Sequence, residues 1–369
     1  MELMQFSAIM LLTLLTLKLL LLPRKVGVSP HVGIARWLMT VGIILLDIQF
    51  LLQYTLGLRA MGVTQAVLVN LIMFIPCSWC ICLSVLYLQR QGRVSRLNRS
   101  IGGFVWALVL LLLGIAAAID GQPLFCDTPE LHWAEVISSI LYLFMQGYYS
   151  GLHLKNLRSM RRTLQNYYDS DMDGMLLWMR FSIMVLIVLA MMVPLLIFVK
   201  SKGLAIFGIL FFFGIFYMVD SFSNYVVSSA PKRMQEAEDS EDATTNSDAT
   251  ANKNTPEEGT EQMRHVELAV TQWTSQGGHL QVGLKLPNAA EAIGVPQYQL
   301  SSWLKQQGYT YASWMTDLRI DEAKRMLIEH PEWNNEAIAQ QCGFSDRTYF
   351  QKKFKEKTGL SPAEYVSKR

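Results

Sequence analysis

Residues 336–365 read EAIAQQCGFSDRTYFQKKFKEKTGLSPAEY, a stretch in which short helical segments alternate with glycine turns. Phe350 and Phe354 stand four residues apart, which places both on one face of a helix. The last segment begins Ser-Pro-Ala-Glu at 361–364, a capping box with proline at the first helical position. The pattern predicts a helix over 336–342, a turn at 343–344, a second helix over 345–357 and a third helix after residue 361.

The same layout occurs once more, earlier in the chain. A helix is predicted over 289–293, followed by Gly294-Val295 and a second helix over 296–306. A longer helix, about Tyr311 to Glu329, would join the two units. Such a pair of helices around a tight turn is a helix-turn-helix unit, whose second helix enters the major groove of DNA. From Met263 onward no run is long enough to cross a membrane, so we expect a soluble, all-helical region.

A set of residue types in register extends this pattern. They are Leu318–Lys324, Ala337–Ala339, Cys342–Asp346, Tyr349-Phe350, Lys353–Lys355 and Thr358–Tyr365. In these residues the region resembles the DNA-binding domain of AraC-type transcription regulators. The first unit departs from the family pattern, because Pro296 stands where the family usually has serine and the turn at Gln307-Gly308 is one residue shorter. The resemblance implies control of transcription in a bacterial cell, with double-stranded promoter DNA and RNA polymerase as partners.

The outward faces of the two second helices supply the candidate DNA contacts. In the second unit, Phe350 and Phe354 define the buried side, which leaves polar residues outside. By resemblance, the base-reading candidates there are Arg347, Thr348, Gln351 and Lys352, with Lys353 and Lys355 nearer to phosphates. The first unit offers Gln297, Tyr298, Ser301, Ser302 and Lys305. Arginine pairs best with guanine and glutamine with adenine. A merely solvated helix face is the alternative interpretation.

The net charge of +2 is the sum of three unlike parts. It is +8 over residues 1–233, −8 over 234–262 and +2 over 263–369. Charged residues make up 17% of the chain, against roughly 25% in an average soluble domain. This composition argues against an ordinary soluble protein and indicates a membrane part.

A helix needs roughly 20 apolar residues to cross a bilayer core. Seven such runs precede residue 230: Leu3–Leu22, Ala35–Leu56, Val63–Leu88, Ile101–Ile119, Ala134–Leu154, Leu176–Val199 and Leu204–Val227. The predicted fold is therefore all-α, with a bundle of seven transmembrane helices followed by the AraC-like domain. The predicted boundaries are 1–230 for the membrane domain, 231–262 for a linker and 263–369 for the DNA-binding domain.

The charges of the loops predict an orientation in the cytoplasmic membrane. The loop after the third run carries four arginines, and the loop after the fifth carries one lysine and three arginines. The loop after the fourth run has Asp120, Asp127 and Glu130 but no lysine or arginine. Because basic loops stay in the cytoplasm, we expect the N-terminus outside and the DNA-binding domain inside. Residues 231–262 are acidic and poor in large apolar side chains, so we expect a disordered tether there.

Two aspartates stand inside predicted spans, Asp47 in the second and Asp220 in the seventh. Ionisable groups in a membrane are costly and usually face the bundle interior or a water-filled cavity. They are candidates for a ligand or proton sensor; a structural hydrogen bond between helices is the alternative, and the residues leave both open.

No catalytic or metal motif emerges, so we expect neither an enzyme nor a bound cofactor or metal. Cys77, Cys80 and Cys82 scatter over different faces of one helix, which favours packing. The run Asp169, Asp171, Asp173 imitates the start of a calcium loop. Arg180 occupies the twelfth position, where glutamate is required, so an acidic, solvated loop is expected.

Together these features predict a one-component regulator in which a membrane bundle senses a small molecule or a membrane state and the tethered domain binds DNA. Two chains would present two domains to paired DNA sites, so a homodimer is left open. A transporter or channel with a regulatory DNA-binding tail is the alternative function. A third hypothesis is release of the domain by proteolysis in the linker.

Overall fold

The computed structural model describes residues 2–22, 30–57, 63–120, 126, 128–170, 172–195, 202–251 and 256–368. Every regular element among these residues is a helix, in agreement with the predicted all-α class. The chain divides into two compact units. The first comprises Met1–Arg158 and Met175–Lys232, and the second comprises Ser159–Gly174 and Arg233–Arg369.

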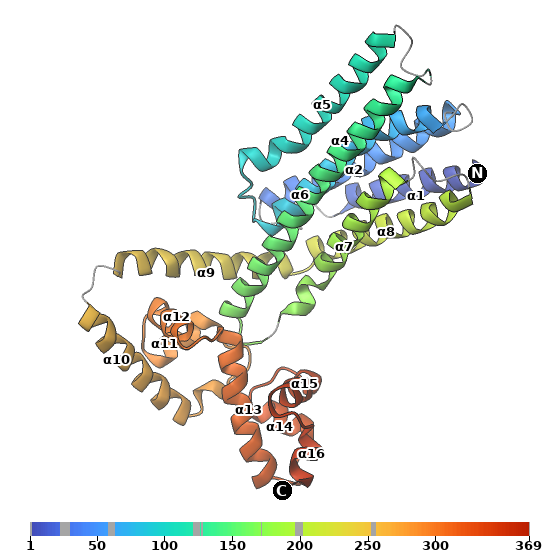
Figure 1. Cartoon of the computed structure of the whole chain (residues 1–369). Helices are drawn as coiled ribbons and strands as arrows, with labels where there is room; N and C mark the ends of the chain where they lie inside the picture. Colours follow the sequence, from blue (N-terminus) through green and yellow to red (C-terminus); the bar gives the residue numbers. More distant parts are fainter. Residues whose placement is uncertain are drawn as a thin grey trace. The chain divides into compact units, whose positions relative to one another are not determined.

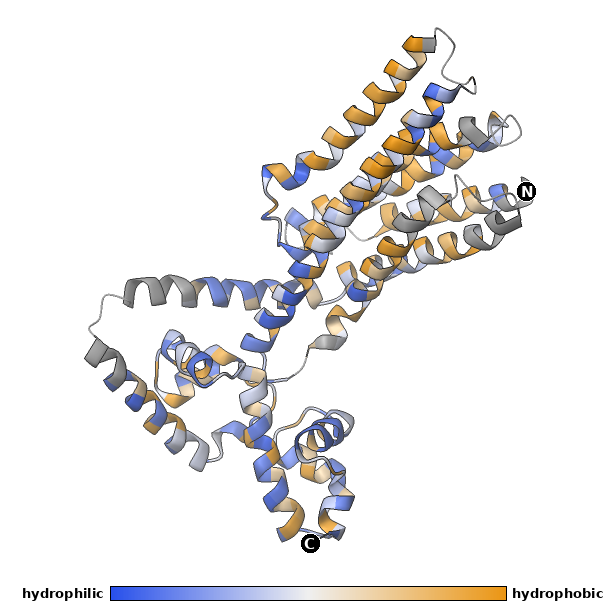
Figure 2. Cartoon of the chain, viewed as in Figure 1, coloured by the Kyte–Doolittle hydropathy of each residue, from blue (hydrophilic) through white to orange (hydrophobic). Residues whose placement is uncertain are grey.

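The first unit is a bundle of long apolar helices (Figure 1). They are α1 (Glu2–Leu21), α2 (Pro30–Thr55), α4 (Val63–Gln89), α5 (Arg96–Asp120), α6 (Pro129–Tyr167, to residue 158 in this unit), α7 (Asp173–Leu195) and α8 (Lys202–Val227). α2 packs against both α1 and α4, and a buried cluster joins α4, α5 and α6. Figure 2 shows that apolar residues dominate these helices.

Four helices in the described part of the chain are long and apolar enough to cross a membrane: Pro30–Thr55, Val67–Gln89, Arg96–Ile119 and Gly208–Val227. They coincide with the second, third, fourth and seventh predicted runs. Two shorter apolar helices, Gln5–Leu21 and Gly174–Val188, fall on the first and sixth runs. The fifth run, 134–154 within α6, is not among them, and residues 196–199 of the sixth lie outside the described residues. The number of seven spans therefore stays a prediction.

The second unit holds the remaining helices. They are α9 (Ala230–Ala251), α10 (Pro256–Ser275), the 3-10 turn η1 (Gly278–Leu280), α11 (Leu286–Ile293), α12 (Gln297–Gln306), α13 (Tyr311–Glu329), α14 (Asn335–Gln341), α15 (Arg347–Thr358) and α16 (Pro362–Ser367). Trp314 and Met315 of α13 belong to one core with α10, α11 and α12. Ile320, Ala323 and Leu327 of the same helix belong to a second core with α14 and α15. α13 thus joins two small subdomains (Figure 1).

The structure differs from the expected disordered tether at 231–262. Its described residues lie in α9 and in the start of α10. Alanine, glutamate, glutamine and methionine are good helix formers, so the acidic composition does not oppose a helix. Met234 and Ala237 are also almost fully buried, which gives α9 a packed side. Tertiary packing of this kind is invisible in the composition.

Candidate nucleic-acid interface

The turn of the second helix-turn-helix unit requires glycine. Gly343 has a φ of +80°, in the left-handed region that residues with a Cβ rarely adopt. A Cβ at this position would lie 2.5 Å from the carbonyl oxygen of Leu280 and 3.0 Å from Nε of Arg319. The turn between α14 and α15 is therefore pressed against the η1 loop and α13.

α15 is fixed at its start and along one face. The carboxylate of Asp346 accepts a hydrogen bond from the backbone N–H of Tyr349 at 2.7 Å, which caps the helix. Phe350 and Phe354 are fully buried and pack edge to face, with ring centroids 5.6 Å apart. These contacts set the rotation of α15 about its own axis.

The opposite face of α15 carries the predicted base readers. Arg347, Thr348, Lys352 and Lys355 are exposed, and Gln351 is half-buried. No ion pair or side-chain hydrogen bond among the described residues involves Arg347, Lys352 or Lys355. Other basic residues of α15 are engaged within the domain. The ammonium group of Lys353 pairs with Glu356 at 3.0 Å, and that of Lys357 pairs with Asp317 at 2.5 Å. The cations left for phosphate or base contacts therefore lie on one face.

The first helix-turn-helix unit, α11 and α12, has the same local design. Gly294 closes α11 with a φ of +83°, and its N–H donates to the carbonyl oxygens of Ala290 and Glu291. Leu300 and Leu304 hold α12 in the core. The candidate readers Gln297, Tyr298, Ser301 and Ser302 are all half-buried, and Lys305 is exposed. The two reading helices thus differ in exposure, because α15 is open and α12 is partly covered.

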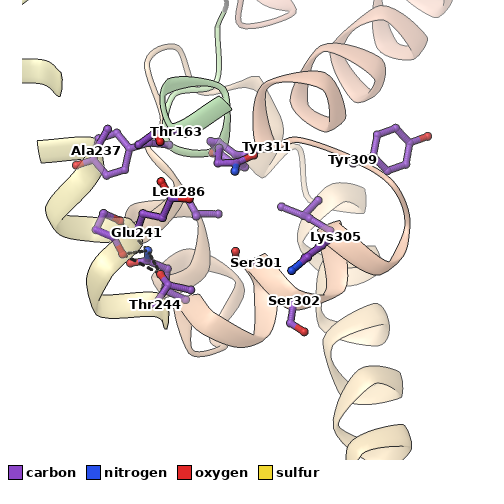
Figure 3. Close-up of a pocket in the computed structure, with 15 residues that line it drawn as sticks. Thr163, Ala237, Glu241, Thr244, Leu286, Ser301, Ser302, Lys305, Tyr309 and Tyr311 are labelled. Carbon is purple, nitrogen blue, oxygen red and sulfur yellow. Dashed lines mark hydrogen bonds between the residues drawn. The ribbon is translucent and has the colours of Figure 1, made fainter. Parts of the chain in front are cut away.

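Helix α9 and the end of α6 provide this cover. The side-chain amide of Gln297 donates to Oγ of Ser240 at 2.7 Å and to Oγ1 of Thr244 at 2.8 Å. A cavity of about 360 Å³ adjoins these contacts (Figure 3). Its lining includes Thr163 of α6, Glu241 of α9, and Ser301, Ser302 and Lys305 of α12. The predicted readers of the first helix-turn-helix unit therefore face α9 and the end of α6, which belong to the same compact unit of the chain.

A buried ion pair holds the segment after α6 against α13. Nη2 of Arg319, in α13, donates to Oδ2 of Asp169 at 2.7 Å and to the carbonyl oxygen of Gln281 at 2.8 Å. Nε of Arg319 donates to the carbonyl oxygen of His279 at 2.9 Å. Oδ2 of Asp169 also accepts from the backbone N–H of Leu284 at 3.0 Å. Asp169 is 3% exposed, so the expectation of a solvated acidic loop is wrong at this residue. Asp171 lies outside the described residues.

Three titratable groups report on the surroundings of these contacts. Burial lowers the pKa of His279, whose ring lies against Trp273. The hydrogen bond to Glu236 raises the pKa of Lys285. Lys285 directly precedes α11, so this ion pair links α9 to the start of α11. Burial raises the pKa of the Cys342 thiol to about 12, so this cysteine serves as a packing residue and not as a reactive thiolate.

In the first compact unit, the helical bundle, both predicted sensor aspartates have partners on another helix. Asp220 of α8 forms an ion pair with Lys18 of α1. Oδ2 of Asp47 accepts from Oγ1 of Thr13 at 2.9 Å. These contacts fit the structural interpretation, and the sensor role stays a prediction. Sequence reasoning missed Lys18, although a lone lysine inside an apolar run is a signal that could have identified it. No group of residues suited to hold a metal ion occurs in the described part of the chain.

Comparison with known proteins finds a family model and curated relatives that each match part of this chain. A family described as a helix-turn-helix domain matches residues 289–368. The regulatory protein PocR of Salmonella typhimurium is 31% identical over 88 residues, which are 24% of this chain and 29% of the relative. The uncharacterized HTH-type transcriptional regulator YobQ of Bacillus subtilis is 34% identical over 88 residues, 24% of this chain and 36% of the relative.

The arabinose operon regulatory protein of Escherichia coli is 32% identical over 81 residues, 22% of this chain and 27% of the relative. The chain thus spans about a third or less of the length of these relatives. No solved structure matches the chain significantly. The family match at residues 289–368 includes both helix-turn-helix turns, at Gly294 and Gly343.

Proposed function

Because residues 289–368 form a helix-turn-helix domain of the AraC type, we propose that the chain is a membrane-integrated, one-component transcription regulator that binds promoter DNA. The observation that carries the proposal is the exposed face of α15, where Arg347, Lys352 and Lys355 have no partner among the described residues. Arg347, Thr348, Gln351 and Lys352 would read bases, and Lys355 would contact phosphate.

The proposal places the first unit in the cytoplasmic membrane as a sensor of seven spans. The four long apolar helices support it. So do large apolar side chains on outward surfaces: Phe104 of α5, Phe144 of α6 and Phe213 of α8 are 71%, 73% and 70% exposed. Apolar surface on this scale is unfavourable in water and suits lipid. The N-terminus would lie outside the cell and the DNA-binding domain inside.

A signal would bias the conformation or pairing of the bundle and so change how two DNA-binding domains are presented to paired sites. Membrane attachment keeps two such domains near each other, which raises their effective concentration without new contacts. In this account the membrane domain ends near residue 230 and the DNA-binding domain occupies 263–369, with RNA polymerase as the partner at the promoter.

DNA reading is tested by selection from genomic DNA. Full-length protein purified in detergent is mixed with sheared DNA of its own genome, and the bound fragments are sequenced. We expect enriched fragments that share a motif. The variant Arg347→Ala/Lys352→Ala should lose this enrichment. The matched control Lys324→Ala removes a half-buried cation of α13 that pairs with Asp321, and it should keep the enrichment. Equal enrichment by the double variant and the wild type would contradict the proposal.

Orientation is tested with a thiol reagent that does not cross membranes. Cys126 follows α5, in a loop that the proposal places outside. Ser95 precedes α5, in a loop that the proposal places inside. On intact cells the reagent should label Cys126 in the wild type, and Ser95→Cys should add no label until the membrane is opened. The reverse pattern would contradict the orientation.

A further inference from the structure

Helix α9 is an acidic helix placed against the first reading helix. Over Ala230–Ala251 it carries six acidic and two basic residues. Polar contacts connect it to the first helix-turn-helix unit: Gln297 donates to the hydroxyl and the backbone oxygen of Ser240 and to the hydroxyl of Thr244. Nζ of Lys285 lies 2.8 Å from a carboxylate oxygen of Glu236. α9 therefore meets this unit with hydroxyl and carboxylate oxygens.

These contacts fall on the side of α12 that would read DNA. Gln297 is bound directly, and Ser301, Ser302 and Lys305 line the cavity that also has Ser240, Glu241 and Thr244 of α9 on its wall. Figure 3 shows Ser301 and the amino group of Lys305 between α12 and the α9 side of this cavity. A volume of 360 Å³ suits a small molecule and not a duplex. The major groove is about 12 Å wide and admits one helix, so α12 has no room for DNA while α9 lies over it.

From this juxtaposition we propose that α9 is an intramolecular competitor of DNA, an acidic helix whose oxygens occupy the DNA-reading face of α12. The inference rests on the proposed DNA binding and adds its regulation. In the state with α9 bound, only α15 can engage DNA. Release of α9 frees α12, and the domain then reads DNA with both units.

The end of α6 anchors this closed state. Asp169 follows α6 and is bound by Arg319 in the core of the unit, and the hydroxyl of Tyr168 donates to the backbone oxygen of Arg233 at 3.3 Å. The ammonium group of Lys285 lies 5.6 Å from the ring centroid of Tyr167, beside the ion pair with Glu236. α6 begins in the first compact unit, and α9 follows α8, the last helix of that unit. Both covering segments are therefore tied covalently to the proposed membrane helices. A change in those helices can thereby release α12.

The first test is a variant that weakens the cover without changing charge. Ser240→Leu/Thr244→Leu removes both hydroxyl acceptors of Gln297 and leaves the longer contact of 3.4 Å with the backbone oxygen of Ser240. It also adds bulk at the contact and keeps good helix formers in α9. The matched control, Ala243→Leu, places the same side chain at an exposed position of α9. Affinity for sheared genomic DNA is measured at low salt on full-length protein in detergent.

The loss of two hydrogen bonds predicts that the double variant binds DNA about tenfold more tightly than the wild type and the control. Equal affinity of all three proteins would overturn the competition while leaving the proposed DNA binding intact. An absence of binding in all three, under conditions where 50 mM salt favours nonspecific contacts, would instead refute the proposed function itself.

The second test needs no substitution. Hydrogen exchange of the wild-type chain is followed without and with saturating sheared DNA. The proposal expects peptides of α12 and α15 to become protected while peptides of α9 exchange faster. Protection of α12 without faster exchange in α9 would show that the two do not compete.

Discussion

Nη2 of Arg319 and Oδ2 of Asp169 lie 2.7 Å apart, 150 residues from each other in the chain, with both side chains almost fully buried. Arg319 belongs to the helix that joins the two helix-turn-helix units, and Asp169 is the second residue after the end of α6. The pair therefore connects the centre of the helix-turn-helix domain to the segment that follows α6, a helix that begins in the first compact unit.

Removing one partner of this pair should be costly. Asp169→Asn leaves the guanidinium of Arg319 buried without its counter-charge, and we expect a loss of about 3–5 kcal/mol in the free energy of unfolding of the second unit. Asp321→Asn, which breaks an exposed pair with Lys324, should change it by less than about 1 kcal/mol. Denaturant unfolding followed by tryptophan fluorescence checks both. A similar small effect of the two substitutions would show that the buried pair contributes little.

The two turn glycines offer a matched comparison. Gly294 and Gly343 have φ values of +83° and +80°, but a Cβ at Gly294 would meet nothing within 4 Å. We expect Gly294→Ala to cost about 1–2 kcal/mol for the left-handed backbone alone. Gly343→Ala adds a clash with the carbonyl oxygen of Leu280 and should cost more than about 3 kcal/mol. Equal losses in thermal or denaturant unfolding would mean that the η1 loop moves away freely.

His279 should make the stability of the second unit depend on pH. Burial lowers its pKa from the ordinary value of 6.5, so the folded state binds a proton less readily than the unfolded state. The stability that the neutral ring contributes is fully present above pH 6.5 and is lost as the pH falls through the lowered pKa. His279→Phe should flatten this slope, whereas the exposed His265→Gln should not. Unfolding measured between about pH 5 and pH 8 tests this, and an unchanged slope in His279→Phe would contradict it.

The exposed cations of α15 should differ in what they contribute. Lys355→Ala is expected to weaken binding evenly across sequences and to reduce the dependence of log K on log salt by about 1, as for one phosphate contact. Arg347→Ala should cost about 1–3 kcal/mol and relax the preference at one base pair. Titrations of a selected fragment and its single-base variants at several salt concentrations separate the two. A loss of sequence preference in Lys355→Ala would reverse these assignments.

Substitutions at Lys18 and Asp220 can distinguish a structural role of Asp220 from a sensing role. Lys18→Met leaves Asp220 unpaired and should lower the thermal stability of the full chain in detergent, while Lys18→Met/Asp220→Leu should recover much of it. A structural pair predicts that the double variant still responds to the signal, once the signal is known. Loss of the response in a stable double variant would favour the sensor interpretation of Asp220.

Much of the DNA-binding domain could be predicted because its signals are local. The linking helix Tyr311–Glu329 has the predicted bounds, and the capping box of Ser361 and Glu364 is present. The second reading helix starts at Arg347 instead of residue 345, because Asp346 takes the cap position.

The covering contacts could not be predicted in this way. Asp169 looks like a surface acid in sequence, since its partner Arg319 lies far along the chain. The sequence of α9 is typical of a disordered tether. Its packing could not be predicted, because it depends on the burial of Met234 and Ala237 against other segments. Composition reports the average environment of a segment, whereas these features depend on particular long-range contacts.

The proposed function depends on DNA reading by the outer face of α15, where Arg347 and Lys352 are exposed. Chromatin immunoprecipitation of the full-length protein, beside Arg347→Ala/Lys352→Ala expressed at the same level in the membrane, tests it most directly. We expect discrete peaks that share a motif and disappear in the double variant. Identical peaks in the wild type and in Arg347→Ala/Lys352→Ala, or no peaks for the variant Ser240→Leu/Thr244→Leu, in which α12 is uncovered, would contradict DNA reading by α15.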